Sequence, residues 1–375
     1  MSGAPLALGF LALTSCGPQP VEPASVPVAS ERSGSTGVED SGRSTDTGAA
    51  ERLGLLSLNL HCLRLDGTGY ADNDARFAAI ADAVSRGGAD VLALQEVCVQ
   101  GEVDALEELR AALIVATGDP WEGRYAFAHT AWEGTPDEAQ EGVGLLSRRG
   151  LGSPTELPYV DPGELRRVGL FATLDDGTTV ATVHLDHGSG TSREAQARQT
   201  ASQVLAASAG LDVLVAGDLN GRAGGPAHGA FLSMGFLDLS GELSSGAIDF
   251  AFAHRGSRWS AERAELWFEE EPVSDHAGVF VSLVAGVPEE VPRTRVVAHV
   301  DVGYGHTLSV RGDAEPLSWD RGWWAWPAAG ERWELVLTEI DTPFAYKTLV
   351  DDVSWQTGED MSGAVGVDNE VRPSF

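Results

Sequence analysis

Lysine is almost absent from this chain. Lys347 is the only one in 375 residues, and arginine supplies the other positive charges. Asp and Glu number 56 against 25 Lys and Arg, which gives a formal net charge of −31. Such a surface repels polyphosphates at long range and lacks the basic footprint of a nucleic-acid binder. We therefore expect no stable complex with nucleic acid, although a local cationic cleft is not excluded.

The apolar stretch near the N-terminus is short. It runs from Leu6 to Leu13, too short to span a bilayer, and is typical of the hydrophobic part of a secretory signal. The small residues before Cys16 resemble a bacterial lipobox, in which the cysteine is lipidated, although no Lys or Arg precedes the stretch. We expect residues 1–16 to be a lipoprotein signal peptide and the protein to be exported, anchored to a membrane or cell surface by lipid alone, or secreted. An ordinary signal peptide with an incidental cysteine is the alternative.

Cysteine is also scarce, with three in the chain. If Cys16 carries lipid, Cys62 and Cys98 remain. Each follows a polar residue by two or three positions at the end of a predicted strand, and these strands could be neighbours. A disulfide between them fits an oxidising compartment, and two unpaired buried thiols are the alternative.

Composition divides the chain into segments. Residues 17–50 are rich in Pro, Ser, Thr, Gly and acidic residues without apolar periodicity, which predicts a disordered linker. Residues 51–286 form the main predicted domain, and the Pro-Glu-Glu-Val-Pro stretch within 287–293 predicts a second, short linker. Residues 294–375 contain more than half of the tryptophans, in short runs between turn residues, and predict a small all-β, immunoglobulin-like sandwich.

Hydrophobic patterns predict alternating strands and helices in the main domain. Strands are expected at Leu53–Leu60, Val91–Leu94, Gly142–Leu146, Val168–Leu174, Thr179–His184, Val213–Ala216, Ala247–Phe252 and Val279–Val284. Helices are expected at Ala75–Arg86, Val103–Ala116 and Arg193–Ala207, the last with Arg193 and Arg198 on its exposed side. This order favours an α/β fold in which two sheets form a sandwich covered by helices.

Polar residues stand where several of these strands end. Leu55–Asn59, Gln95-Glu96, Gly217–Asn220, Ile248–Phe250 and Ser274–His276 each place a carboxylate, amide or imidazole there. Open α/β sheets build sites at strand ends, and these groups bind Mg²⁺ and activate water. Each motif alone is compatible with a turn or a helix cap. Five in one order predict a metal-dependent phosphodiesterase.

The roles follow from the chemistry of each side chain. Glu96 suits a metal ligand, because Mg²⁺ prefers carboxylates. Asp218 and Asn220 are two residues apart, so they face one side and could orient water and bind a phosphate oxygen. His276 could act as acid or base if Asp249 fixes its tautomer. Asp275 is a further candidate metal ligand.

The region from about Leu53 to Val284 resembles the endonuclease/exonuclease/phosphatase superfamily, also called deoxyribonuclease I-like. The motifs that carry the resemblance are those above, together with Gly142–Arg148 and Thr182–Leu185. The resemblance implies that Asn59 and Glu96 are metal-site residues and that His184 contacts the scissile phosphate. It assigns water and phosphate to Asp218 and Asn220, and pairs Asp249 with His276. Arg167 matches a phosphate-facing arginine.

The C-terminal region, from about Arg295 to Val367, resembles the starch-binding modules of carbohydrate-binding family 20. Leu317–Asp320, Phe344–Lys347 and Val353–Trp355 carry the likeness, although the family's Pro-Asn pair after the last tryptophan is replaced here by Gly358–Asp360. The resemblance implies that Trp319 and Trp355 stack on glucose units and that Lys347 bonds their hydroxyls. A β-sandwich that docks on the main domain is the alternative.

These observations predict an exported, Mg²⁺- or Mn²⁺-dependent phosphodiesterase with a glycan-binding module. Its partners would be a phosphate ester of unknown identity and an α-glucan. Two other functions remain open. One is a surface glycan-binding lipoprotein whose phosphoesterase domain is inert, and the other is a secreted nuclease.

Overall fold

The computed structural model describes residues 50–244 and 247–375. The predicted signal peptide with Cys16, and residues 17–49 of the predicted linker, lie outside this range. The described residues form one compact unit. Of the helices in the described ranges, none has the length and hydropathy that a membrane span requires.

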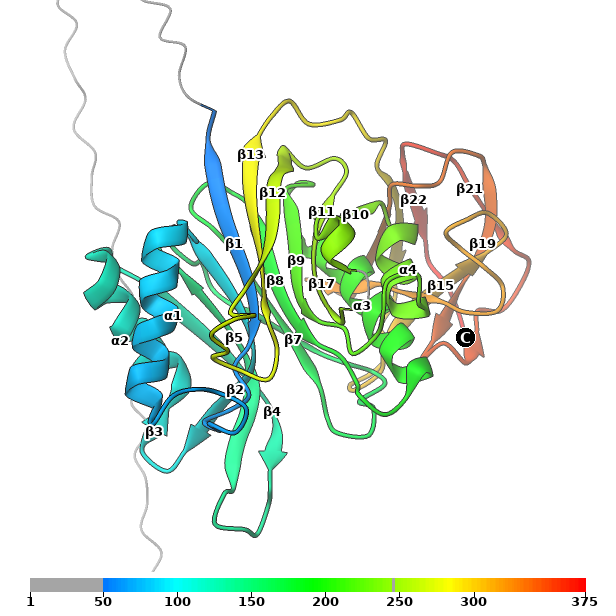
Figure 1. Cartoon of the computed structure of the whole chain (residues 1–375). Coiled ribbons are helices and arrows are strands. Elements are labelled where there is room, and N and C mark those ends of the chain that lie inside the picture. Colours follow the sequence, from blue (N-terminus) through cyan, green and yellow to red (C-terminus); the bar gives the residue numbers. More distant parts are fainter. Residues whose placement is uncertain (1–49, 245–246) are drawn as a thin grey trace, which may run out of the picture. The chain divides into compact units, whose positions relative to one another are not determined.

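Two large sheets form the main part of the described chain (Figure 1). The first has the order β12 (Trp259–Trp267), β13 (Gly278–Ala285), β1 (Arg52–Asn59), β2 (Val91–Gln100), β5 (Ala139–Ser147) and β4 (Glu122–Ala131), with β3 (Val103–Asp104) beside β2. The second has the order β10 (Phe236–Asp238), β11 (Asp249–His254), β9 (Val213–Asp218), β8 (Thr179–His184), β7 (Val168–Thr173) and β6 (Thr155–Pro158). The parallel pairs are β1–β2 and β8–β9.

Helices α1 (Asn73–Gly87) and α2 (Ala105–Thr117) cover the outer face of the first sheet. Asp72 caps α1 by accepting from the Ala75 N–H, and Gly88 ends it in the left-handed conformation. Phe77, Ile80 and Val84 are buried at helical spacing and pack against β1 and β2. The two sheets face each other across a second core, built by side chains of the opposite faces.

Helices α3 (Gly190–Ala207) and α4 (Pro226–Ser233) cover the second sheet, and η1 (Gly241–Ser244) is a short 3₁₀ turn. The C-terminal region is β-rich, in agreement with the prediction. One of its sheets contains β17 (Trp326–Ala328), β18 (Arg332–Leu337), β14 (Thr294–His299) and β22 (Asp368–Val371). The other contains β16 (Trp323–Trp324), β15 (Leu308–Gly312), β19 (Phe344–Val350), β20 (Ser354–Trp355) and β21 (Met361–Gly363). An immunoglobulin-like form for this region stays a prediction.

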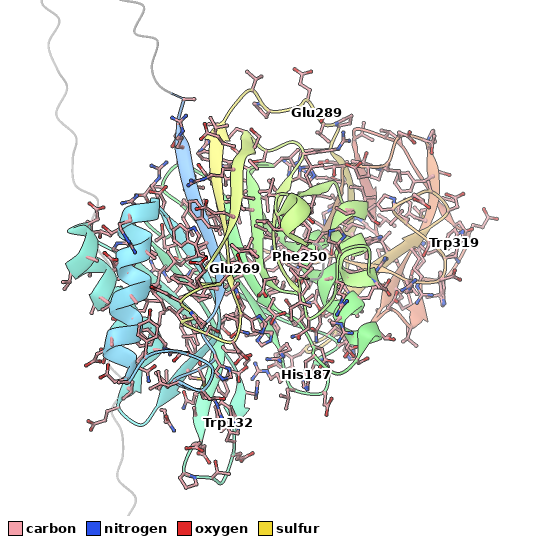
Figure 2. The ribbon with its side chains drawn as sticks, viewed as in Figure 1. Trp132, His187, Phe250, Glu269, Glu289 and Trp319 are labelled. Atoms are coloured by element: carbon pink, nitrogen blue, oxygen red, sulfur yellow. A yellow bond between two sulfur atoms is a disulfide. The ribbon has the colours of Figure 1, made fainter. Side chains whose placement is uncertain are left out.

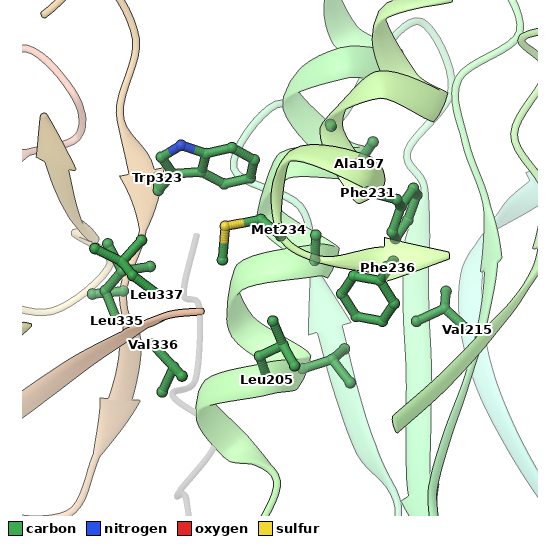
Figure 3. Packing of buried hydrophobic residues seen from close by; sticks show 14 of the residues in the cluster. Ala197, Leu205, Val215, Phe231, Met234, Phe236, Trp323, Leu335, Val336 and Leu337 are labelled. Carbon is green, nitrogen blue, oxygen red and sulfur yellow. The ribbon is translucent and has the colours of Figure 1, made fainter. Parts of the chain in front are cut away.

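A single hydrophobic core joins the C-terminal sheets to the second large sheet. Leu205 of α3 and Phe231 of α4 belong to the same cluster as Trp323 and Leu335 (Figure 3). The prediction that Arg198 lies on an exposed side of its helix is wrong. Its guanidinium stacks 3.8 Å from the Trp323 ring and donates to a C-terminal backbone carbonyl, because the helix is covered on both sides.

His254 makes a buried polar contact across the same junction. Its Nδ1 accepts from the Gly256 N–H, so Nε2 carries the proton and donates to Thr338 Oγ1 at 2.9 Å. Burial and the charges of Arg255 and Arg293 lower the pKa of His254 from its ordinary value to about 4. The neutral ring is therefore the form that the fold requires.

This predicts a stability loss in acid. As pH falls through 6.5 the unfolded chain takes up a proton that folded His254 refuses until about pH 4, so this contribution is complete above pH 6.5 and decreases towards pH 4. The loss should reach at most about 3 kcal/mol. Urea unfolding of wild type and His254→Gln at several pH values measures it, and the variant should lose less stability over this window. Parallel curves would contradict the assignment.

Candidate active site

The predicted site residues converge at one edge of the two sheets. Strands β1, β8 and β9 end there, with Asn59, His184 and Asp218 as their last residues. Strand β11 runs antiparallel to β9 and therefore begins there with Asp249, the register partner of Asp218. His276 precedes β13, which is antiparallel to β1, so it reaches the same edge.

Asn59 links the carboxylates of both sheets. Its Nδ2 donates to Glu96 Oε1 at 3.0 Å and to Asp218 Oδ2 at 3.4 Å, and its Oδ1 accepts from the His61 N–H. Glu96 stands at a break in the β2–β5 register with a positive φ of 46°, which turns its side chain out of the strand's alternation. Asn59 therefore directs its amide nitrogen at the site and positions Glu96. The resemblance had implied that Asn59 itself is a metal-site residue.

Asp218 lies at the centre and is almost fully buried. Its Oδ1 accepts from the Asn220 N–H at 2.7 Å, and its Oδ2 lies 3.6 Å from His184 Nε2 and 3.9 Å from His276 Nδ1. Burial and the charge of Asp249 raise the pKa of Asp218, against the opposing effect of His276. A carboxylate with a raised pKa is a stronger base, which suits the activation of water.

His276 forms the predicted pair with Asp249. The Asp249 Oδ2 atom accepts from His276 Nδ1 at 2.8 Å, which leaves Nε2 for other contacts. Burial favours the neutral ring, but the hydrogen bond and charge of Asp249, with the charge of Asp218, outweigh it and raise the pKa of His276. The ring is held protonated near neutral pH and can act as an acid.

His184 has its tautomer fixed by Arg167. The guanidinium only donates, and its Nη1 lies 3.2 Å from His184 Nδ1, so the ring proton must be on Nε2, the side of Asp218. Burial, followed by the charge of Arg167, lowers the pKa of His184 well below its ordinary value. A neutral Nε2–H donor results, which is suited to hold a phosphate oxygen.

The sequence interpretation missed Glu141. This buried residue of β5 accepts from Arg167 Nη1 at 3.1 Å, and His129 lies 3.8 Å from its other oxygen. Burial and the charge of Glu96 raise the pKa of Glu141 to about 7. Its position beside the predicted strand Gly142–Leu146 was the only signal that could have indicated it.

Cys62 and Cys98 form a disulfide, with their Cα atoms 4.9 Å apart. Cys62 follows Asn59 by three residues and Cys98 follows Glu96 by two, so the bridge ties together the ends of β1 and β2 beside the site. The predicted metal ligand Asp275 is half exposed, and its Oδ1 lies 3.2 Å from His61 Nδ1. His61, also missed from the sequence, thus stands between Asp275 and Glu96.

The residues fit a divalent cation. Glu96, Asp218, Asp249 and Asp275 concentrate negative charge, and the buried Asp249 Oδ1 has no hydrogen-bond partner within the described residues. Ligand atoms of Asp218, Asp249 and His276 also lie within 4.8 Å of one another. His276 Nδ1 is already bonded to Asp249, so this cluster serves proton transfer better than it binds metal. Carboxylate oxygens at Glu96 and Asp275 are the more suitable ligands for Mg²⁺ or Mn²⁺.

A buried arginine holds the loops that carry the site. The Arg76 side chain of α1 is fully buried, and its guanidinium donates to the carbonyls of Leu60, Cys62 and Arg64. It also reaches the Val273 carbonyl at 3.4 Å. The loop after β1 and the loop before His276 are therefore joined through one side chain.

Replacing Arg76 with Met should lower the free energy of unfolding by about 2–5 kcal/mol, because buried carbonyls lose their donor. Arg86→Met, on the same helix, is the matched control. That side chain is exposed and pairs only with Asp82, so its loss should cost less than about 0.5 kcal/mol. Urea unfolding of both variants measures the difference, and equal costs would show that Arg76 does not hold the loops.

Of the predicted glycan-site residues, Lys347 lies in β19 and Trp355 in β20, and Trp319 lies in the segment between β15 and β16. The rings of Trp319 and Trp355 are 6.2 Å apart at 36°, and Arg311 lies 5.2 Å over the Trp355 ring. Lys347, the register partner of Arg311, donates to the Gly358 carbonyl at 2.9 Å. Figure 2 shows Trp319 in the C-terminal region, whereas Trp132 and His187 lie near the site edge.

Comparison with known proteins bears on this arrangement. Residues 56–276 match the model of the Endonuclease/Exonuclease/phosphatase family, which is more than half of the chain. The chain belongs to the endonuclease/exonuclease/phosphatase family. The fold expected for residues 53–284 is thereby confirmed as that family's two-sheet sandwich, the fold of enzymes that act on phosphate esters. A search of curated proteins finds no match.

Solved structures similar to this chain have low sequence identity to it. An endonuclease/exonuclease/phosphatase from Beutenbergia cavernae is 18% identical, with a TM-score of 0.51, over 83% of this chain and 99% of that one. A family protein from Leptotrichia buccalis is 16% identical over 62% and 99%, with a TM-score of 0.49. A mannosyl-6-phosphatase from Bacteroides thetaiotaomicron is 16% identical over 62% and 99%, with a TM-score of 0.44. The similarity to the Beutenbergia cavernae structure covers 83% of this chain, which is more than the residues before 287 amount to. It therefore extends into the C-terminal region.

Proposed function

We propose that this chain is an exported, metal-dependent phosphodiesterase that hydrolyses a phosphate ester by in-line attack of water. The observation that carries the proposal is the convergence of Asp218, His184 and the His276–Asp249 pair on one buried point, with Glu96 beside it. Glu96 and Asp275 would hold Mg²⁺ or Mn²⁺, which when bound neutralises the phosphate charge and stabilises the leaving oxygen.

Two different side chains carry out the two proton transfers of the reaction. Asp218, with its raised pKa, takes the proton of the attacking water, and Asn220 binds a phosphate oxygen. Asn220 Nδ2 donates to the Leu185 carbonyl, which holds its side chain near the end of β8. His276, protonated through its pair with Asp249, gives a proton to the leaving oxygen. Two groups whose environments favour opposite proton transfers are typical of an acid–base pair.

The remaining groups bind the phosphate. His184 donates from Nε2, the nitrogen that Arg167 leaves protonated. Arg167 is itself buried against Glu141, which partly compensates its positive charge. Its effect on the phosphate is therefore indirect, because it fixes the tautomer of His184. Arg167 is therefore proposed as a positioning residue, where the sequence suggested a direct phosphate contact.

Export is supported by two separate features. The Cys16 motif resembles a lipidation signal, and the Cys62–Cys98 disulfide is typical of an oxidising compartment. We place the protein outside the cytoplasm, anchored by lipid at Cys16 or secreted. The net charge of −31 argues against a nuclease as the main role.

Hydrolysis of bis-(p-nitrophenyl) phosphate by the full chain tests the catalytic proposal. Release should require Mg²⁺ or Mn²⁺ and stop in EDTA, and Asp218→Asn should reduce it by about 10²–10⁴-fold. The exposed Asp82→Asn is the matched control and should retain wild-type turnover. Equal rates for the two variants would contradict the role of Asp218. No release under any condition would favour an inert domain.

A glycan-binding function for the C-terminal sheets is a second proposal. The observation that favours it is the Trp319–Trp355 pair, because Trp355 is 42% exposed and an exposed indole is a surface for a sugar ring. Lys347 would donate to sugar hydroxyls, although its Nζ is now bonded to the Gly358 carbonyl. An α-glucan is the ligand that we expect.

Replacing Trp319 or Trp355 with Ala should weaken binding of maltoheptaose by about tenfold or more, because each indole supplies buried contact area. Tyr304→Ala is the control, since this fully exposed aromatic lies apart from the pair in the sequence and should be dispensable. Isothermal titration of the full chain measures the affinities. Binding that survives both tryptophan replacements would show that the glycan binds elsewhere, and no binding by the wild-type chain would refute the proposal.

A further inference from the structure

His61 stands among three carboxylates beside the expected metal position. Its Nδ1 lies 3.2 Å from Asp275 Oδ1 and 3.9 Å from Glu96 Oε2, and its Nε2 lies 3.5 Å from Asp66. The Nε2 atom is buried and has no hydrogen-bond partner within the described part of the chain. No hydrogen bond therefore fixes the ring at Nε2, on the Asp66 side, and Nδ1 is the nitrogen that faces the proposed metal ligands Asp275 and Glu96.

The backbone holds His61 rigidly in this place. Its φ of 49° and that of Cys62, 57°, are both left-handed, so the chain makes a sharp turn after β1. The His61 N–H donates to Asn59 Oδ1, and the next N–H, that of Cys62, donates to the Glu96 carbonyl at 3.0 Å. Arg76 donates to the carbonyls of Leu60 and Cys62 on either side, and the disulfide ties the Cys62 side chain to Cys98.

The chemistry of the donor atoms distinguishes metals. Mg²⁺ prefers oxygen ligands, whereas imidazole nitrogen is suited to transition-metal ions, whose affinities rise from Mn²⁺ along the series. A left-handed backbone costs energy for a residue with a β-carbon. That cost is understandable if it directs a nitrogen ligand towards Glu96 and Asp275.

We propose that His61 is a nitrogen ligand of the active-site cation, and that it makes this chain prefer Mn²⁺ over Mg²⁺. The inference rests on the proposed function, because it deepens the same site by naming a ligand and a metal preference. Glu96 and Asp275 supply the oxygens, and His61 Nδ1 is the nitrogen that faces them both.

A competing explanation predicts the opposite sign. If His61 only neutralises Glu96 and Asp275 as a positive charge, it competes with the cation, and its removal should strengthen the binding of Mn²⁺ and Mg²⁺ alike. If it is a ligand, its removal should weaken Mn²⁺ and leave Mg²⁺ nearly unchanged, since glutamine replaces nitrogen by an amide oxygen.

The test titrates MnCl₂ and MgCl₂ separately into the full chain, its His61→Gln variant and a His187→Gln control. His187 is half exposed and near the site edge, but its ring faces Glu164. Calorimetry gives the affinities, and pulsed electron paramagnetic resonance of bound Mn²⁺ detects a directly bonded nitrogen. We expect nitrogen coupling in wild type and His187→Gln, its loss in His61→Gln, and about a tenfold or greater loss of Mn²⁺ affinity there.

Three results would overturn the proposal. They are the absence of nitrogen coupling in wild type, its persistence in His61→Gln, and tighter binding of both ions by that variant. The first needs no variant, so it stands even if His61→Gln folds poorly. Metal-dependent turnover with no nitrogen coupling would refute this inference alone. A wild-type chain that binds neither ion and shows no turnover would refute the proposed function as well.

Discussion

Asn59 holds the two large sheets together at the point where their polar residues meet. It is fully buried at the end of β1, and one amide nitrogen serves Glu96 of its own sheet and Asp218 of the other. Two carboxylates brought this close repel each other, and burial strengthens the repulsion. A neutral donor between them offsets part of that cost without using a charge. The other site residues stand on or beside strands of these two sheets, and the buried Arg167–Glu141 pair is a second polar link between the sheets.

The sequence predicted the interior of this fold better than its edges. Strands β1, β2, β8 and β9 are continuous apolar runs because they are covered on both faces, and such runs are visible in a single sequence. Strands β4 and β12 were missed because they lie at the edges of the first sheet and carry exposed, polar side chains. The face of α3 was misjudged for another reason. The partner of Arg198, Trp323, lies more than a hundred residues further along the chain, and local periodicity contains no information about it.

The candidate site shows the same division. Asp218 and His276 could be found from the sequence, because each stands beside an end of a predicted strand and open α/β sheets build their sites at strand ends. Glu141 had only its place beside a predicted strand to indicate it, because its direction depends on the face that β5 presents. His61 could not be found, because its direction depends on two consecutive left-handed residues. Backbone exceptions of this kind are features of the folded chain, and residue type alone does not reveal them.

The shared core around α3 has a mechanical consequence. Trp323 and Leu335 pack into the same cluster as Leu205 and Phe231, so the C-terminal sheets are fixed to the phosphoesterase fold through a continuous interior. A module on a flexible tether would search a volume and raise the local concentration of any polymer that it caught. A module fixed in this way instead holds its surface at one set distance from the strand ends. A ligand that contacted Trp319 and the strand ends together would need its sugar and its phosphate to be separated by that same distance. A ligand with another spacing would gain no affinity from the second contact.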